Sequence, residues 1–236
     1  MRRQTIIMKL KISITILFIL SIMVLFNSCQ DDAPAPEVTS GTITLRTQHF
    51  ATVFAKTAGA AAFDSLKITR ARLCLRNIKF KSTTEDSLTF KTTPIMVVLD
   101  TLLTSQSVGA IEVPLGTYKR IEFDIHRLQK SSLAVPADTV TFADFLKGER
   151  YSVIVDVHVY IGGKDSLMIY RSKIDVKQKL DLTPNLVVDK QTANVTATMQ
   201  ISTANWFKFN GVMIDPLDTN NTQKIDDAIM ASIRMK

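Results

Sequence analysis

Hydrophobic and polar residues alternate along short segments spread over residues 41–201, and this pattern constrains the fold more than any other feature of the chain. Successive side chains of a β-strand point to opposite faces, so strict alternation gives one buried face and one solvated face. The segment 153–161 is the clearest case, with valine at every second position from Val153 to Val159 and then Ile161. Seven or eight such segments, separated by turn residues, predict an all-β protein built as an antiparallel β-sandwich.

Three details refine this prediction. The alternation slips by one position within residues 77–80, which indicates a β-bulge. The run 95–99 is apolar throughout, as in a strand buried on both faces. A loop containing Gly162 and Gly163 separates two strand patterns and predicts a hairpin. The predicted strands are 42–45, 66–69, 73–76, 95–99, 121–126, 153–161, 167–176 and 195–201.

Helical signals are few. Residues 51–63 are rich in alanine but contain Gly59, which fits a short helix or a loop, and 142–146 fits a single helical turn. A C-terminal helix from about residue 221 is predicted more firmly, because Ile225, Ile229 and Ile233 recur every four residues. Asn221 or Thr222 is expected to cap this helix, with Asp226 and Asp227 in its first turn.

The N-terminal segment reads as an export signal. Lys9 and Lys11 precede an apolar run over residues 12–26, and Ser28 and Cys29 follow it. This run of about 15 residues is shorter than the roughly 20 that span a bilayer as a helix. An uncleaved membrane helix is the alternative interpretation.

A cysteine directly after such a segment resembles the lipobox of bacterial lipoproteins, and the variant resembles those of the Bacteroidetes. Phe26 stands where leucine is usual. The resemblance implies cleavage after residue 28 and attachment of lipid, palmitate included, to Cys29. The resemblance also predicts that the protein is bound to a membrane through this lipid.

The residues after Cys29 predict a semi-rigid linker and a cellular location. Residues 29–40 hold an Ala-Pro-Ala-Pro run, which favours a semi-rigid spacer. Asp31, Asp32 and Glu37 resemble a signal for display on the outer face of the bacterial outer membrane, although a solvated acidic linker has the same composition. The expected organisation is therefore a signal peptide at 1–28, a tether at 29–40 and one sandwich domain at 41–236.

Charge and cysteine content argue against a nucleic-acid-binding protein and against a fold held by a disulfide. The chain has a net charge of +7, but Arg2, Arg3, Lys9 and Lys11 belong to the leader. Without them 25 basic residues face 22 acidic ones, so the net charge falls to +3 and no nucleic-acid partner is expected. With Cys29 acylated, Cys74 has no disulfide partner, and its apolar surroundings predict a buried, inert thiol.

Several segments together resemble the bacterial domain-of-unknown-function 4382 family, found in exported lipoproteins with a transthyretin-like sandwich. In the most specific segment, residues 113–121, Pro114 and Gly116 form a turn that Tyr118 is expected to plug. The first loop, residues 48–63, departs from the family pattern. The resemblance implies a fold and a location outside the cytoplasm, and it supplies no catalytic residues. The other matching segments are 41–45, 68–80, 98–100 and 102–103.

Two polar triplets are candidate sites. Glu122, Asp124 and His126 share one face of a predicted strand, and Asp156, His158 and Tyr160 share one face of another. If the two strands were neighbours, these groups could hold a divalent metal. A solvated sheet face has the same alternation, and we predict no metal and no cofactor.

Two C-terminal segments have competing interpretations. Residues 215–221 are rich in oxygen ligands but lack the glycine and bidentate glutamate of an EF-hand, so a capped entry into the helix is favoured over a calcium site. Trp206, Phe207 and Phe209 would stack on a sugar if exposed. If buried, they would seal one end of the sandwich against the C-terminal helix, which is the favoured interpretation.

No nucleophile elbow, phosphate loop, CxxC pair or HExxH motif is present. The predicted role is therefore non-catalytic: binding, adhesion or envelope assembly, with a glycan or another envelope protein as partner. A fimbrillin-like subunit that polymerises by strand exchange is the first alternative. A carbohydrate-active enzyme that uses Glu122, Asp124 and His126 is the second.

Overall fold

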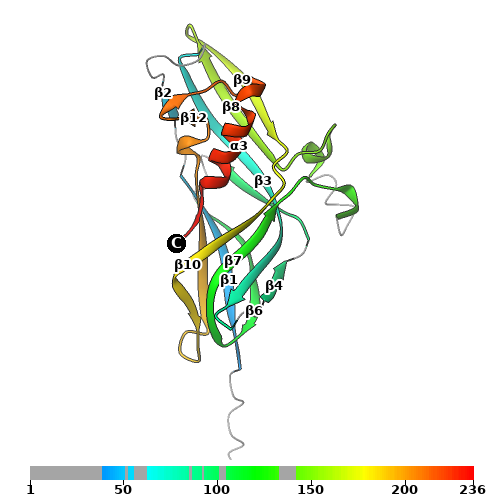
Figure 1. Cartoon of the computed structure of the whole chain (residues 1–236), viewed down its shortest axis with the longest axis vertical. Coiled ribbons are helices and arrows are strands. Elements are labelled where there is room, and N and C mark those ends of the chain that lie inside the picture. Colours follow the sequence, from blue (N-terminus) through cyan, green and yellow to red (C-terminus); the bar gives the residue numbers. More distant parts are fainter. Residues whose placement is uncertain are drawn as a thin grey trace, which may run out of the picture. The chain divides into compact units, whose positions relative to one another are not determined.

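A computed structural model describes residues 39–50, 53–55, 63–84, 87–91, 93–100, 105–132 and 142–236 (Figure 1). Residues 39–236 form one compact unit with its own hydrophobic core. A chain that begins at Gln30 keeps all of this unit. The predicted signal peptide, Cys29, Asp31, Asp32 and Glu37 lie outside the described residues.

The smaller of the two main sheets has the strand order β14-β11-β1-β6. Strand β1 pairs antiparallel with β6 and parallel with β11, so that Ile43 lies opposite both Ile111 and Val195. At the start of β1, Gly41 is buried against Val188 and the carbonyl of Ala193, which leave no room for a Cβ. The strands are β1 Ser40–Phe50, β6 Ser105–Pro114, β11 Asn194–Ser202 and β14 Ile233–Met235.

The larger sheet is organised around one long strand, β3 (Ser65–Ser82), and has the order β10-β7-β3-β8-β9. Strand β8 pairs with the first half of β3 and β7 with the second half. The short strands β2, β5 and β4 pair with β3 as well. The bounds are β2 Val53–Ala55, β4 Ser87–Lys91, β5 Ile95–Asp100, β7 Gly116–Ile125, β8 Val153–Ile161, β9 Lys164–Ser172 and β10 Val176–Val188.

The two sheets enclose one main core, which confirms the predicted β-sandwich with a C-terminal helix. Ile43, Leu45 and Met199 of the smaller sheet and Phe80 and Phe123 of the larger one belong to the same buried cluster. The described residues contain fourteen strands, more than the seven or eight predicted, and one pair of them is parallel. Strands β6 and β10 were not predicted, because their sequences lack a clear hydrophobic alternation.

The predicted bulge lies in β3. Pairing with β7 shifts register between Arg76 and Lys79, and Asn77 between them has a φ of 52°. Asparagine tolerates this left-handed conformation better than most residues. The bulge lets both Leu75 and Ile78 remain fully buried although they are three positions apart.

The predicted hairpin is tighter than its sequence indicated. Ile161 pairs with Lys164, so the loop consists of Gly162 and Gly163, with φ of 54° and 79°. A two-residue loop with both φ values positive matches the twist of the flanking strands. Strand β9 ends at Ser172, and β10 begins at Val176, where the predicted strand ended.

Tyr118 closes the turn between β6 and β7, as predicted. Its side chain is 2% exposed, and its hydroxyl donates a hydrogen bond to the Pro114 carbonyl oxygen at 2.8 Å. We expect Tyr118→Phe to lower the free energy of unfolding by about 1 kcal/mol, because one buried hydrogen bond is lost and the ring stays. Urea denaturation measures this change; Tyr160→Phe, on a half-buried strand position, is the control and is expected to have little effect.

The C-terminal segment covers one end of the sandwich. It contains η3 (Thr203–Asn205), β12 (Lys208–Phe209), β13 (Val212–Met213), η4 (Thr219–Asn221) and α3 (Thr222–Ala231), followed by β14. Helix α3 buries Ile225 and Ile229 as predicted, but Ile233 is buried from β14 and not from the helix.

Of two further expectations about the start of the helix, the cap position is correct, but the capping bond and the acidic first turn are not found. Asn221 stands at the N-cap without a side-chain capping bond. Its amide donates instead to the Asp215 carbonyl oxygen at 3.0 Å. Because the helix begins at Thr222, Asp226 and Asp227 lie beyond its first turn.

A second, smaller core lies on the other face of β3. Cys74, Leu128, Phe142, Phe145 and Ile154 form it. The short helix η2 (Ala143–Leu146), which follows η1 (Lys130–Ser132), supplies Phe145 and confirms the helical turn predicted at 142–146. The described part of 51–63 includes strand β2 and no helix. No helix within the described residues has the length and apolar character needed to cross a membrane.

Candidate functional site

The two predicted polar triplets do not meet. Leu75 pairs with both β5 and β7, and Ala71 pairs with both β5 and β8. A strand has two edges, so β7 and β8 follow one another along the same edge of β3. The condition for a shared metal site, that the two strands lie side by side, is not met. No cluster of three or more potential metal-ligating side chains occurs among the described residues.

Each member of the β7 triplet has a separate local partner. Glu122, only 7% exposed, lies 3.3 Å from Lys177 Nζ, and Asp124 accepts a 2.6 Å hydrogen bond from Asn77 Nδ2. His126 follows the end of β7, and its Nδ1 lies 2.7 Å from Asp175 Oδ1. The predicted outward face is therefore largely covered, and its charges form ion pairs across the sheet.

The β8 residues are arranged in the same way. Asp156 Oδ1 lies 3.5 Å from Nη2 of the buried Arg72, and His158 Nδ1 lies 2.9 Å from Asp165 Oδ1 on β9. Arg72 also donates to Asp144 Oδ2 at 2.8 Å. Hydrogen bonds from Arg72 and Lys147 lower the pKa of Asp144 to about 2. These contacts join η2 to the sheet.

In the oxygen-rich loop before α3, Asp218 caps the short helix η4, whereas α3 itself has no side-chain cap. The Asp215 carboxylate accepts a hydrogen bond from the Leu217 amide, and Asp218 accepts one from the Asn220 amide, at 2.8 and 2.9 Å. The carboxylates are thus engaged with backbone N–H groups of their own loop. This use of the oxygen atoms explains the composition of the loop without a calcium ion.

The aromatic cluster is mostly buried. Trp206 and Phe207 are 0% exposed, and Trp206 Nε1 donates to Ser232 Oγ just after α3 at 2.9 Å. They seal the end of the sandwich, as favoured. Phe209 differs: it is 46% exposed, and Lys224 Nζ lies 5.0 Å from its ring centroid.

Cys74 is a buried thiol, as predicted. It is 1% exposed, and desolvation raises its pKa to about 12. A thiol with so high a pKa is almost entirely protonated at neutral pH and is a poor nucleophile.

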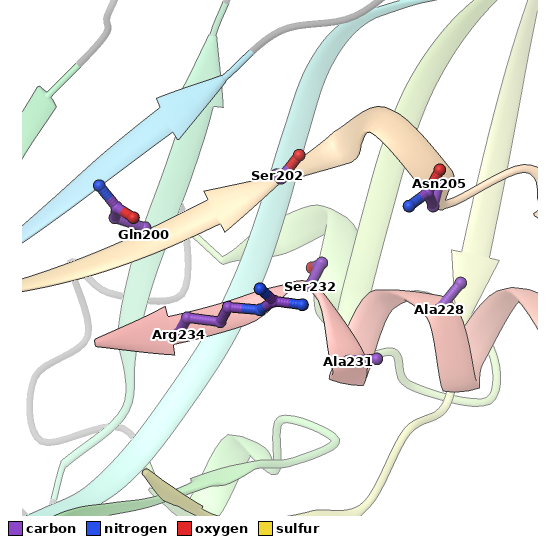
Figure 2. A pocket seen from close by; sticks show the side chains of 7 residues that line it. All are labelled: Gln200, Ser202, Asn205, Ala228, Ala231, Ser232 and Arg234. Carbon is purple, nitrogen blue, oxygen red and sulfur yellow. The ribbon is translucent and has the colours of Figure 1, made fainter. Parts of the chain in front are cut away.

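A pocket of about 360 Å³ with a mixed polar and apolar lining lies where β11, η3, α3 and β14 meet (Figure 2). Gln200 and Ser202 of β11 and Arg234 of β14 line one side, and Ala228 and Ala231 of α3 line the other. Gln200 and Arg234 lie opposite each other in the β11–β14 pair. Asn205 and Ser232 complete the lining.

The pocket offers hydrogen-bonding groups and one positive charge. Ser232 Oγ already accepts from Trp206 and donates to the Ile229 carbonyl oxygen at 2.6 Å. Gln200 Nε2 donates to Gln48 Oε1 at 3.2 Å. Arg234 is exposed, and within the described part of the chain it makes no ion pair, so its guanidinium is available to an anion.

No family model matches the chain, and no curated protein matches it. Among solved structures, the chain is similar to MbnP from Methylosinus trichosporium. The sequences are 14% identical, the TM-score is 0.40, and the match covers 75% of this chain and 81% of that chain. This similarity is too distant to support a functional argument.

The pocket was not predicted from the sequence. Alternation along residues 195–201 does place Gln200 on the polar face of β11, and this was the available signal. Arg234 could not be linked to it from sequence, because 33 positions separate the two residues and β14 contains three residues.

Helix α3 carries a titratable contact beside the core. Tyr170 Oη donates to Asp226 Oδ1 at 2.9 Å, and burial raises the pKa of Asp226 above its ordinary value. At pH values between the ordinary pKa of an aspartate and the raised pKa of Asp226, the folded state holds more protons than the unfolded state. The free energy of unfolding therefore falls as the pH rises through that interval. We therefore expect Asp226→Asn to increase the free energy of unfolding at pH 7.

Urea denaturation between pH 3 and pH 7 tests this expectation. The gain should shrink as the pH falls through the raised pKa of Asp226 and should be lost below about 4, the ordinary value for an aspartate, because the wild-type carboxyl is then protonated in both states. Asp227→Asn, at an exposed position, is the comparison: the Asp227 carboxylate contributes least to the raised pKa of Asp226, so this variant should give a smaller gain. Equal gains at every pH would contradict the assignment of the effect to Asp226 ionisation.

Proposed function

We propose that the protein is an exported lipoprotein, anchored through lipid on Cys29, whose β-sandwich has a non-catalytic binding role at the outer membrane. The observation that carries this proposal is the sequence from Lys9 to Cys29: a basic start, a short apolar run and a cysteine directly after a small residue. The described sandwich begins ten positions later, at Thr39. This spacing suits a folded domain joined to a membrane surface by a short tether.

The physical basis of the anchor is the burial of acyl chains. Each buried methylene contributes about 0.8 kcal/mol, and one chain gives only marginal binding, so stable anchoring needs two or more. A diacylglycerol and an amide-linked chain on Cys29 would satisfy that requirement.

Metabolic labelling with an alkyne analogue of palmitate tests the anchor. The wild type should incorporate the label and fractionate with membranes, and Cys29→Ser should lose both properties. Cys74→Ser is the matched control, because Cys74 is the chain's other cysteine and is buried. Label that persists in Cys29→Ser would refute lipidation at this position.

Display on the cell surface is the second part of the proposal, and the acidic residues after Cys29 support it. Protease treatment of intact cells should remove a C-terminal tag from the wild type. Replacing Asp31, Asp32 and Glu37 by Asn, Asn and Gln should protect the tag until the outer membrane is opened. Protection of the wild-type tag in intact cells would place the domain in the periplasm.

The pocket supports a binding role for a small polar anion. Arginine pairs with carboxylates through parallel hydrogen bonds, and the amide and hydroxyl groups beside Arg234 suit sugar hydroxyls. We therefore propose acidic glycans as the ligand class. Calorimetry with uronic-acid oligosaccharides should show binding that Arg234→Ala abolishes and that Arg171→Ala, on another sheet, leaves unchanged.

One observation favours the fimbrillin-like alternative. Strand β14 lies at a sheet edge and pairs with β11 through three residues. Such a strand is a candidate for exchange between subunits by β-augmentation. Ladders of purified protein that disappear when residues 233–236 are deleted would support the polymer, and an unchanged monomer would count against it.

A further inference from the structure

Strand β9 forms one margin of the larger sheet. In the described structure its pairing partner is β8, and the ladder covers nine residue pairs from Ile161–Lys164 to Val153–Ser172 without a register shift. Its other edge therefore presents backbone groups that no described strand binds. Such an edge is a template for another strand.

The hairpin loop determines which groups face outward. In a two-residue loop the flanking residues, here Ile161 and Lys164, bond to each other through both N–H and C=O groups. Hydrogen bonding then alternates along the strand, so the even-numbered residues of β9 bond to β8. The free edge belongs to the odd-numbered residues Asp165, Leu167, Ile169 and Arg171.

The side chains of these four residues share the outer face of the sheet. Tyr170 and Ser172, on the opposite face, are buried. Leu167 is 62% exposed and Ile169 is 38% exposed, although both are large and apolar. Asp165 and Arg171 flank them, so the edge carries an apolar centre with a negative charge at one end and a positive charge at the other.

Other long edges carry features that hinder pairing. Strand β6 contains Gly109 next to a register shift against β1. Strand β10 contains Pro184 within an interruption of its pairing with β7, between Asp181 and Leu186. Bulges and prolines are common means of protecting sheet edges, and β9 contains neither.

We propose that the β9 edge binds a second copy of this chain, antiparallel and centred on Met168. In an antiparallel partner the outer-face residues Asp165, Leu167, Ile169 and Arg171 follow one another in the opposite direction. Leu167 then lies opposite the second copy's Ile169, and Asp165 lies opposite its Arg171. The twofold axis repeats both pairs, so two apolar pairs and two ion pairs form on one face.

The proposed register agrees with the hydrogen-bonding pattern. Its hydrogen-bonded pairs join odd-numbered residues, which are the residues whose backbone groups are free. Moving the centre to Leu167 or Ile169 also joins odd-numbered residues, but it places a charged residue opposite an apolar one. Charge and apolar complementarity therefore select the register centred on Met168.

Both charges are already held in place on the edge. Asp165 contacts His158 Nδ1 at 2.9 Å, and the Arg171 guanidinium lies 5.7 Å from the Tyr151 ring centroid. A carboxylate has about four acceptor positions and a guanidinium five donors, so both retain capacity for a second partner. The proposed interface involves β8, β9 and Tyr151 and does not depend on the lipid anchor.

Charge reversal tests the pairing. For a chain of residues 30–236, sedimentation equilibrium should show a concentration-dependent dimer without larger species. Asp165→Arg and Arg171→Asp should each weaken the dimer at least tenfold, because like charges then face each other. The double variant D165R/R171D should restore it, since its ion pairs form with reversed sign. Thermal unfolding followed by circular dichroism checks that each variant is folded.

A disulfide tests the register. Leu167→Cys mixed with Ile169→Cys should form a crosslinked heterodimer faster than either variant crosslinks with itself.

Leu217→Lys, at a residue that is 71% exposed on another element, is the control and should leave the dimer unchanged. A monomer at high micromolar concentration, or a dimer that ignores both single charge reversals, would overturn the proposal.

Discussion

Trp206→Ala is expected to lower the free energy of unfolding by about 3–5 kcal/mol, which is among the largest effects of a single substitution in this chain. Trp206 is fully buried, and its indole N–H bonds to Ser232 between α3 and β14. The substitution leaves a cavity and removes the donor to Ser232. Both changes weaken the attachment of the C-terminal segment to the sandwich. Urea denaturation of the chain 30–236 measures the loss.

Phe209→Ala is the matched control. Phe209 belongs to the same aromatic cluster but is 46% exposed, and its ring contacts Lys224. A loss of less than about 1 kcal/mol is expected for this partly solvated side chain. Equal losses for the two variants would contradict the assignment of the sealing role to Trp206.

Phe145→Ala is expected to cost about 3 kcal/mol and to expose Cys74 to thiol reagents. Phe145 is fully buried in the second core with Cys74, Leu128 and Ile154. It comes from a short 3-10 helix whose other connections to the sheet include the Asp144–Arg72 ion pair. Loss of the ring should therefore open this layer locally before the sandwich unfolds.

The labelling rate of Cys74 measures this opening. In a chain that begins at Gln30, Cys74 is the sole cysteine, so a coloured thiol reagent reports on one site. Trp206→Ala is the control, since it destabilises the main core and not the second core that contains Cys74. Phe145→Ala should label faster than Trp206→Ala at equal global stability. Equal rates would show that Cys74 becomes accessible only through global unfolding.

Local sequence patterns predicted many individual elements. Alternation located the core-facing residues of β8 and β11, and the slip at Asn77 located the bulge. Tyr118 was placed in its turn, Cys74 in a buried position and the C-terminal helix at residues now seen in α3. These features depend on neighbouring residues, because side-chain direction and backbone conformation are set within a few positions.

Strands with a weak hydrophobic pattern were harder to recognise from the sequence. Strand β10 has charged or polar residues at most positions of its first half and contains Pro184, and β6 is polar over much of its length. Ile233 continued the helical spacing, but the chain leaves the helix at Ser232 to pair with β11. Pairing with a distant strand overrode a local helical preference there.

The sequence by itself determined the strand-rich class and the buried faces of the strands, and it is the basis for proposing a lipoprotein-like leader. Only the tertiary structure decided that β7 and β8 lie in succession along β3, so that the two polar triplets remain apart. It also decided that β11 lies parallel to β1, that Arg234 lies beside Gln200, and that β9 is left at an edge. The physical reason is that alternation specifies which face of a strand is buried, whereas the choice of neighbouring strand depends on packing across the whole chain.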